Sequence, residues 1–477
     1  MKFRQKRKKQ NDWGKIVDFC ERTTLHGVRH LVDFNRHWTE ILLWTIVVIL
    51  LCVGSTLMIY NSWNRFNTNP TVISIQKDYR TWKTAFPAAT VCFANKLDVK
   101  LAERLIKKNW PAATEEQLRY SMSFLYTVAN AEYKSFNHFL LFRDDKRLDK
   151  LDLLKLATQV SINMTYDARV FDMKFKDLGF LRTLTEMGIC YTFGGVLSQS
   201  YTQQTTNTQA ANKNVKPPYC SFQNPLCYAS IEDLPVNLSY YIHSAYEMPV
   251  SGSTGYKVQH NMERETTFRF LETVASKALR HLLPEQRRCR FVDEPLAKWR
   301  GVLGLAHYSH NTCIMECRRR VAYDYCQCSP HFLLKNDQYY QVCGVEGLAC
   351  LARYFKTLMT IKSQGPPFNC DCLPNCEDVK FFLDKNTKRE WTHPVPDNIR
   401  FRWAIEIYSK TRLKRDIIYG FEDLLVSCGG TAAFFLGCSL LTFIEIFYFF
   451  VAHLISYSWS EINKIKIFIS RRIRWDD

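Results

Sequence analysis

Residues 424–455 read LLVSCGGTAAFFLGCSLLTFIEIFYFFVAHLI, an apolar run of 32 residues in which Glu445 is the only carboxylate. About 20 apolar residues are enough for a helix to cross the hydrocarbon core of a bilayer, so this run is longer than one straight span needs. Gly429, Gly430 and Gly437 lie in its middle, where small residues allow helices to approach closely or to break. The run predicts either a single tilted helix with a small-residue packing face or a broken segment that lines a pore.

Glu445 favours the broken segment. A carboxylate at membrane depth is costly, and in membrane proteins it usually faces a water-filled path. The alternative is a glutamate near a helix end whose side chain reaches the interface. We therefore predict that residues 424–455 form a pore-lining transmembrane segment.

A second apolar run, residues 41–60, contains 20 residues and no charge. Its length fits one transmembrane helix. A cleaved signal peptide is the alternative interpretation, but the run begins after about 40 residues and has no clear small-residue cleavage site. We therefore expect a first transmembrane helix at 41–60.

Basic clusters at both ends of the chain give the predicted orientation. The formal net charge is +18, from 64 Lys+Arg against 46 Asp+Glu, and the first ten residues and the tail at 456–477 are both rich in Lys and Arg. Positive charge collects on the cytoplasmic side, so we expect 1–40 and 456–477 in the cytoplasm and 61–423 outside the plasma membrane. The clusters can contact anionic lipid. Nucleic-acid binding is the other use of such runs, and the two membrane runs argue against it.

The cysteines agree with this orientation. The chain has 18 Cys, of which fourteen lie in segment 61–423. An even number in an oxidising compartment indicates a disulfide framework. A zinc site built from Cys313, Cys317 and the cysteines at 370–376 is the alternative, but His residues are sparse there and the segment is extracellular. We therefore expect no metal and no other bound cofactor.

Periodicity and composition divide the extracellular segment into elements. In chain order we expect a strand at 71–79, helices broken by Pro111 across 97–142, a solvated polar loop at 198–218, an amphipathic helix at 263–283 and a strand at 401–408. Ten cysteines between 289 and 376 predict a compact unit stiffened by disulfides. The sequons at Asn163 and Asn237 predict glycosylation of this segment.

Four short motifs together carry a family resemblance. They are His26-Gly27, FPAATVC at 86–92, CDCLPNC at 370–376, and the glycine-rich second run with Gly437-Cys438-Ser439 ahead of Glu445. In this combination the chain resembles the degenerin/epithelial sodium channel family from about residue 23 to residue 448. The segments IHSAYEMP at 242–249 and RRCRF at 287–291 look like the insect pickpocket branch of that family.

The resemblance implies an α+β membrane protein that assembles as a trimer, with two transmembrane helices per subunit. Its large disulfide-rich extracellular domain would comprise a β-sheet palm, a β-ball, and a helical finger and thumb. The strands at 71–79 and 401–408 would belong to the palm, and the stretch 289–376 to the thumb. Carried over by order, the family's disulfides are Cys92–Cys190, Cys289–Cys376, Cys313–Cys372, Cys317–Cys370, Cys326–Cys350 and Cys328–Cys343, which leaves Cys220 with Cys227.

The resemblance also implies a function. The chain would be a pore-forming subunit of a sodium-selective, amiloride-sensitive cation channel of the plasma membrane, gated through its extracellular domain, and not an enzyme. Its partners would be two further subunits of the same family, the lipid bilayer, and an extracellular ligand or stimulus that the sequence does not identify. Na⁺ would be the permeant ion rather than a cofactor.

The family pattern assigns roles to residues of the second run. Gly437, Cys438 and Ser439 match the Gly-x-Ser selectivity filter, at which oxygens replace the hydration that a cation loses. In a trimer, Glu445 becomes a ring of three carboxylates below the filter that concentrates cations. In the family, the segment with His26-Gly27 re-enters the membrane and lines the lower pore, although taken alone His26 is an ordinary tail residue.

Two residues depart from the family pattern near the expected gate, which we place at Val426, Gly429 and Gly430. Ala433 stands where the family often has glycine, which stiffens the segment above the filter. Val426 stands about where the family keeps a small residue. Because a branched side chain there hinders tight closure, we expect appreciable resting current.

Three rival classes are weighed against a sodium channel. An ATP-gated trimeric channel also has two spans and a cysteine-rich exterior, but it lacks the motif at 370–376. A two-span ectoenzyme would need a catalytic motif, and residues 437–439 lack the second glycine of a nucleophile elbow and lie in an apolar run. A non-conducting receptor or auxiliary subunit needs neither Glu445 nor the filter glycine.

Overall fold

The computed structural model describes residues 17–451, with 455 and 462, except 18, 34–35, 110–113, 165–166, 171–172, 198–216, 224–226, 233, 235, 295–306, 334–340, 362–367 and 392–398. The chain divides into two compact units. The apolar unit comprises Met1–Val72 and Ile417–Asp477, and the cysteine-rich unit comprises Ile73–Asp416. The basic clusters of both tails, and nearly all of the polar loop predicted at 198–218, lie outside the described residues.

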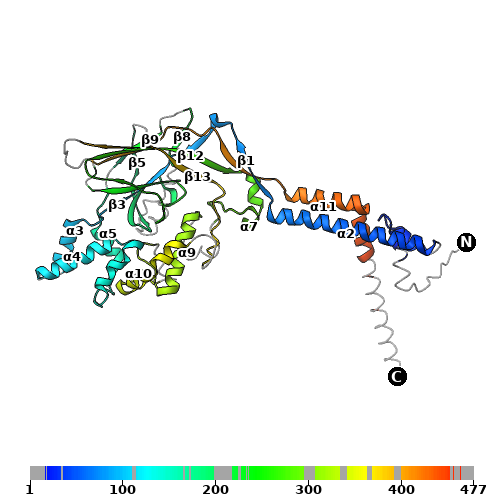
Figure 1. Ribbon diagram of the computed structural model, residues 1–477, viewed down its shortest axis with the longest axis horizontal. Coiled ribbons are helices and arrows are strands. Elements are labelled where there is room, and N and C mark those ends of the chain that lie inside the picture. Colours follow the sequence, from blue (N-terminus) through cyan, green and yellow to red (C-terminus); the bar gives the residue numbers. More distant parts are fainter. Residues whose placement is uncertain are drawn as a thin grey trace, which may run out of the picture. The chain divides into compact units, whose positions relative to one another are not determined.

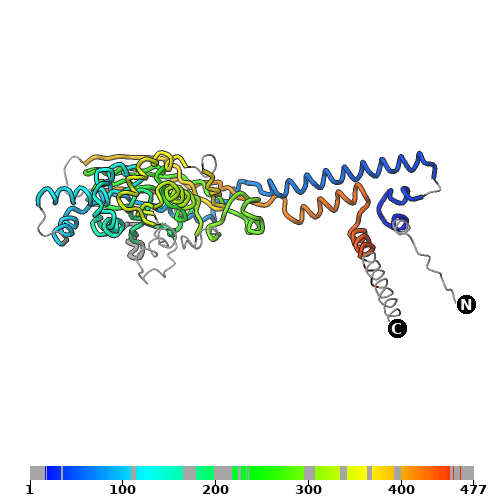
Figure 2. Tube along the Cα trace, turned by 90° about the horizontal axis from the view of Figure 1, so that it is seen from below, coloured from blue at the N-terminus to red at the C-terminus, as the bar shows by residue number. Residues whose placement is uncertain are grey.

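Two helices lie side by side in the apolar unit, α2 (Trp38–Thr68) and α11 (Phe421–Leu436), as Figures 1 and 2 show. A short 3-10 helix, η1 (Val28–Leu31), precedes α2. Among the described residues, α2 is the one straight helix with the length and apolar character to cross a membrane. The pair formed by α11 and the following helix, Leu440–Val451, meets the same test only when the two are taken together.

Helix α2 is longer at both ends than the predicted span at 41–60. It begins after His37, whose ring nitrogen accepts a hydrogen bond from the amide of Thr39 at 3.4 Å. It continues through a polar stretch and ends at Thr68, two residues before Pro70. Proline disfavours helical conformation in the residue before it, so Pro70 rather than the loss of apolar character sets this end.

The cysteine-rich unit contains two larger sheets and one strand pair. In spatial order the first sheet is β1 (Thr71–Gln76), β15 (Arg412–Ile417), β12 (Met262–Ala275), β14 (Arg400–Ile405), β9 (Tyr228–Ile231), β4 (Asp167–Val170) and β5 (Met173–Gly179), with β13 (Asp378–Glu390) also paired to β12. The second is β11 (Tyr256–Val258), β10 (Leu238–His243), β3 (Ala88–Phe93), β7 (Gly188–Phe193) and β6 (Leu181–Thr185). The pair is β2 (Lys83–Ala85) with β8 (Tyr219–Ser221).

An aromatic core joins the two larger sheets. Trp403 of β14 is fully buried, and its ring packs against those of Phe86 and Phe193. The indole N–H donates to the backbone oxygen of Pro87 at 3.1 Å, so the one polar atom of this buried ring is satisfied.

Helices form a second core in the same unit. The helices of this unit are η2 (Tyr79–Thr81), α3 (Val99–Asn109), α4 (Glu115–Ala129), η3 (Tyr133–Phe142), α5 (Leu153–Val160), η5 (Lys277–His281), α7 (Pro284–Arg287), α9 (His310–Cys326) and α10 (Val345–Thr360), and five of them, α4, η3, α5, α9 and α10, form the core. Figure 1 shows α9 beside α10, and the core they share with η3, α4 and α5 contains Phe136, Phe332 and Leu348.

Seven disulfides cross-link the cysteine-rich unit. They are Cys92–Cys190, Cys220–Cys227, Cys289–Cys376, Cys313–Cys372, Cys317–Cys370, Cys326–Cys350 and Cys328–Cys343, which are the six pairs that the family resemblance implies and the one pair that those six leave over. Five of them lie within 289–376 and tie α9 to α10 and to the segment at 370–376. This stretch is the compact stapled unit that its cysteine density predicts.

The prediction of an amphipathic helix at 263–283 is wrong. Residues Met262–Ala275 form β12, and a 3-10 helix follows at Lys277–His281. The side chains of Arg264, Thr266 and Phe268 are buried, with a period of two. The β-branched and aromatic residues of this stretch favour a strand, and β12 pairs along nearly its whole length with β13.

The other predicted elements agree with the structure in kind but differ in extent. A strand occurs at Thr71–Gln76 and helices at Val99–Asn109 and Glu115–Ala129, while the break expected at Pro111 lies outside the described residues. The strand predicted at 401–408 is β14, Arg400–Ile405. It does not lead directly into the second apolar run, because β15 lies between them in the sequence.

Candidate functional site

The second apolar run breaks at Gly437. Helix α11 ends there, with Gly437 at φ +66°, and the axis turns by 80° into the helix Leu440–Val451. A left-handed residue is a common helix terminator, and glycine adopts that conformation without the steric cost of a Cβ. The prediction of a broken segment is therefore confirmed, and its break falls on the residues matched to the family's filter.

Ser439 begins the helix after the break. Its hydroxyl oxygen accepts a hydrogen bond from the amide of Thr442 at 3.3 Å, and its own amide donates to the Thr442 hydroxyl at 3.1 Å. This reciprocal arrangement satisfies two backbone donors at a helix start. Ser439 is exposed, whereas the side chain of Cys438 is buried within the apolar unit.

The segment that contains His26 and Gly27 packs against the break. The amide of His26 donates to the backbone oxygen of Leu436 at 3.1 Å and so satisfies a carbonyl at the end of α11. Its imidazole lies so close to Gly437 that a Cβ on that glycine would overlap the ring. Gly27 has φ +84°, and a Cβ there would come within 2.9 Å of a methyl carbon of Val48 in α2.

Glu445 receives hydrogen bonds from the same N-terminal segment. The hydroxyl of Thr24 donates to Glu445 Oε2 at 3.2 Å, and the Thr24 amide lies 3.5 Å from the same oxygen. The Thr24 hydroxyl is also 2.8 Å from that of Thr442, which is buried. Two ends of the chain, 421 residues apart, therefore meet at one carboxylate.

One face of α11 packs on α2. The hydroxyls of Ser62 and Ser427 lie 3.0 Å apart, and a Cβ on Gly54 would come within 3.1 Å of the Phe435 ring. Small residues therefore let the two helices approach closely.

Another face of α11 has no neighbour in the described chain. Val426 is 76% exposed, and a Cβ on Gly429 or Gly430 would meet nothing within 4 Å. With Ala433, which is also exposed, these residues follow the three-and-four spacing of one helix face. The three predicted gate residues thus lie together on this open face, two to three turns before the break.

The structure brings most of the predicted site residues together. His26 meets Gly437, and Glu445 is joined through two threonines to Ser439, whereas Gly27 packs against Val48 of α2. Sequence reasoning did not identify Thr24 or Thr442. The nearest signals were the position of Thr24 two residues before His26 and that of Thr442 three residues before Glu445.

The two predicted glycosylation sites are in the cysteine-rich unit. Asn163 and Asn237 are both exposed. The side-chain oxygen of Asn237 accepts a hydrogen bond from the amide of His260 at 2.6 Å, which orients the side chain.

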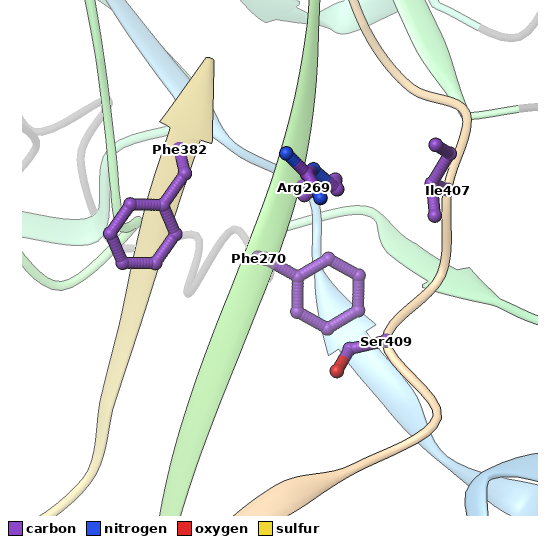
Figure 3. A pocket seen from close by; sticks show the side chains of 5 residues that line it. All are labelled: Arg269, Phe270, Phe382, Ile407 and Ser409. Carbon is purple, nitrogen blue, oxygen red and sulfur yellow. The ribbon is translucent and has the colours of Figure 1, made fainter. Parts of the chain in front are cut away.

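A cavity of about 420 Å³ opens where β12 changes partners. Residues Glu263–Phe268 of β12 pair with β14, and Thr273–Ala275 pair with β15. Between these ladders, Phe270 and Arg269 line the cavity with Phe382, Ile407 and Ser409 (Figure 3). The charge of Arg269 is already paired, because its guanidinium forms a 2.8 Å ion pair with Asp384. The rest of the lining is mainly apolar: the rings of Phe270 and Phe382 and the side chain of Ile407.

Two carboxylates of the cysteine-rich unit, the buried Glu186 and the half-buried Glu247, are held by hydrogen bonds. Glu186 is fully buried, and its Oε2 accepts from Arg318 Nη1 at 2.5 Å and from the amide of Ser251 at 2.8 Å. Glu247 accepts from the Ser309 hydroxyl at 3.1 Å and from Asn375 Nδ2 at 2.9 Å. Burial, reinforced by the charge of Asp378, raises the pKa of Glu247 from 4.5 to about 7.

The family of amiloride-sensitive sodium channels, the degenerin/epithelial sodium channel family, matches residues 19–449. The chain belongs to this family. The match covers the whole cysteine-rich unit, the first apolar run, the segment with His26, and the second apolar run as far as residue 449. The family is one of ion channels in membranes, not of enzymes, and its members form oligomeric channels from subunits of the same family.

Known members of the channel family are similar over most of this chain. Sodium channel protein Nach of Drosophila ananassae is 21% identical over 453 residues, covering 91% of this chain and 86% of that protein. Pickpocket protein 28 of Drosophila melanogaster is 20% identical, covering 91% and 78%. The bile acid-sensitive ion channel of Mus musculus is 23% identical, covering 91% and 86%. The resemblance to insect members of the family is confirmed.

Proposed function

We propose that the chain is a pore-forming subunit of a trimeric, sodium-selective, amiloride-sensitive cation channel of the plasma membrane, gated through its cysteine-rich unit. The observation that carries this proposal is the break at Gly437, with Glu445 in the helix after it and His26 against it. Sodium is the permeant ion, and two further subunits of the same family complete the channel.

The break supports a selectivity filter at Gly437, Cys438 and Ser439. A helix that ends in mid-membrane directs its last carbonyls and the negative end of its dipole toward one place, which attracts a cation that has lost water. The left-handed Gly437 makes that end possible. Three copies around an axis would supply a ring of oxygens at the constriction.

Glu445 supports cation rather than anion conduction. It is the only carboxylate of the run at 424–455, and it follows the filter by about two helical turns. Three such carboxylates around a water-filled axis raise the local concentration of cations and repel anions. The lower pore in this arrangement is lined by His26 and Gly27.

The proposed topology has α2 and the broken segment as two spans, both chain ends in the cytoplasm, and the cysteine-rich unit outside. The seven disulfides support an oxidising compartment for that unit. The exposed sequons Asn163 and Asn237 are compatible with it. The open face with Val426, Gly429 and Gly430 is the proposed gate, because close approach of three helices needs small residues.

The test is expression of the full chain under voltage clamp, alone and with a second family subunit. Replacing external Na⁺ by a large organic cation should abolish inward current, and amiloride should block it. Glu445→Gln, nearly identical in size, should reduce Na⁺ current at equal surface density, whereas Glu422→Gln at the exposed start of α11 should not. Surface expression without any cation current would instead favour a non-conducting receptor.

A further inference from the structure

The turn between β6 and β7 carries its tip into the helical core of the cysteine-rich unit. The side chains on either side of the turn, Leu184 and Ile189, pack in that core together with residues of η3 and α9. The tip itself consists of Glu186 and Met187. The turn therefore brings a carboxylate and a backbone carbonyl into a region that is otherwise mainly apolar.

Two buried cations hold the tip from different elements. Arg318 of α9 donates from Nη1 to Glu186 Oε2 at 2.5 Å. The buried Nζ of Lys96, which lies before α3, donates to the backbone oxygen of Met187. The amide of Ser251 is a second donor to Glu186 Oε2, at 2.8 Å. One oxygen of the carboxylate is thus fully occupied.

Three other polar atoms around the tip have no hydrogen-bond partner in the part of the chain that the structure describes. They are Glu186 Oε1, Arg318 Nε and the hydroxyl of Tyr133 in η3. The side chains of Glu186 and Tyr133 are fully buried, and that of Arg318 is 7% exposed. Burying a polar atom without a partner costs more free energy than a typical hydrogen bond gains. Buried polar atoms are therefore nearly always satisfied, by protein or by water.

The three groups belong to one cluster. Glu186 and Arg318 are joined by the 2.5 Å hydrogen bond. Burial, and after it the negative charge of Glu186, raises the pKa of Tyr133 well above its usual value, while the positive charge of Arg318 acts in the opposite sense. Because such effects weaken with distance, the Tyr133 hydroxyl lies near both charged groups.

The chemistry of these atoms selects the molecule that would satisfy them. Arg318 Nε can only donate a hydrogen bond, the carboxylate oxygen of Glu186 accepts one, and the hydroxyl of Tyr133 can do either. Glu186 would repel an anion, and Arg318 would repel a cation. Water is neutral, accepts and donates, and typically makes about three hydrogen bonds to polar groups where it is buried.

We propose that the cysteine-rich unit has a binding site for one internal water molecule, held by Tyr133, Glu186 and Arg318 between η3, the β6–β7 turn and α9. The water accepts hydrogen bonds from Arg318 Nε and the Tyr133 hydroxyl, and it donates one to Glu186 Oε1. It completes the polar network through which the second sheet is fixed to the helical core. This inference is independent of the proposed channel function.

The first experiment detects the water by X-ray radiolysis of the purified full chain, followed by mass spectrometry. Radiolysis converts water into hydroxyl radicals, so a side chain that contacts an internal water is hydroxylated even where bulk solvent does not reach it. Tyr133 should be hydroxylated several-fold faster than Tyr240, which is equally buried but whose hydroxyl lies 2.8 Å from that of Thr266. Equally slow hydroxylation of the two tyrosines would overturn the proposal.

Two rings of the same core distinguish an internal water from a general opening of the core. Phe136 and Phe332 pack edge-on against Tyr133, with ring centroids 5.4 Å and 5.5 Å from its own, and both are 1% exposed. After correction for the intrinsic reactivity of each residue type, these two rings should stay as slow as Tyr240. Fast hydroxylation of all three rings would show that bulk water enters the core, and it would overturn a discrete site.

The second experiment measures what the Tyr133 hydroxyl contributes to stability. Tyr133→Phe keeps the ring and removes one partner of the water, so it should lower the midpoint of thermal unfolding by about 1–3 °C. Tyr240→Phe, which loses the bond to Thr266, is the matched control and should have a similar effect. A buried hydroxyl without any partner predicts the opposite sign, because its removal relieves an unsatisfied group. A midpoint at or above that of the wild type in Tyr133→Phe would therefore overturn the proposal.

Discussion

The cysteine-rich unit and the apolar unit are stabilised by different kinds of interaction. Seven disulfides, two aromatic and aliphatic cores and buried ion pairs hold the first. In the described part of the second, Cys20, Cys52, Cys428 and Cys438 are all unpaired, and the break is held by single hydrogen bonds. Such a bond contributes about 0.5–1.5 kcal/mol net. The region that holds the proposed gate is thus the one whose contacts cost the least free energy to break.

The largest effect is expected from removing a buried charge in the cysteine-rich unit. Glu186→Ala leaves the Arg318 guanidinium buried without its carboxylate, which costs about 3–5 kcal/mol. Denaturant unfolding of the purified protein and its surface expression both report the loss. The control is Glu115→Ala, whose ion pair with Arg119 is about four-fifths exposed and is worth under about 1 kcal/mol. Equal losses in the two variants would contradict the comparison.

The next effect concerns the break itself. Gly437→Ala places a Cβ on the His26 ring and forces alanine into a left-handed conformation, which alone costs about 1–2 kcal/mol. We expect current at matched surface density to be lost, with little change in the unfolding of the cysteine-rich unit.

Gly429→Ala is the matched control for Gly437→Ala. Its new methyl group meets nothing within 4 Å in the subunit, and alanine favours a helix over glycine. Because Gly429 lies on the proposed gate face, the fraction of current that flows at rest should change in this variant, but the Na⁺ current should not be lost. If Gly437→Ala and Gly429→Ala carry the same current at matched surface density, the left-handed conformation at the break is not needed for conduction.

A pH-dependent effect of moderate size is expected at Glu247. Its pKa is about 7 in the folded state against 4.5 ordinarily, so between these values the folded protein binds more protons than the unfolded chain. The free energy of unfolding should therefore fall as pH rises from about 4.5 to about 7, by at most about 3 kcal/mol. Glu247→Gln mimics the protonated form and should flatten that slope in thermal unfolding between pH 5 and pH 7.5. An unchanged slope would exclude this carboxyl as its source.

The smallest effect is expected at the open face of α11. Val426→Ala removes a branched side chain that hinders close approach of three helices, so resting current should fall. The comparison is with Leu425→Ala at the neighbouring exposed position, which points in another direction around the helix. Resting current is measured as the fraction blocked by amiloride without stimulus. An equal or larger resting current in Val426→Ala would remove Val426 from the gate.

Sequence reasoning placed a break among the small residues of the second apolar run and, through the family resemblance, brought the His26 segment to the lower pore, but it did not identify Thr24. Gly437 and Glu445 are conspicuous in an apolar run, because a flexible residue and a charge are both unusual there. Thr24 carries no comparable signal, since its partner lies 421 residues away and a threonine in a polar tail is ordinary. A contact between the two ends of the chain has no periodicity by which it could be found.

The same limit explains the error at 263–283. In Glu263–Phe270, the order of charged and apolar residues fits both the spacing of a helix and the period of two of a strand. The segment forms a strand because it pairs with β13 on one side and with β14 on the other. The disulfides could be assigned only through the family resemblance, because spacing alone leaves many pairings of fourteen cysteines open.

Strand β15 has a mechanical consequence. It shares three paired positions with β12, whereas β14 shares six and β13 twelve. Because β15 continues in sequence into α11, any tension carried along the chain from that helix loads the shortest of the three ladders. Traction along the chain from α11 would therefore reach β15 first, and the β12–β15 ladder should separate before the ladders that β12 makes with β13 and β14.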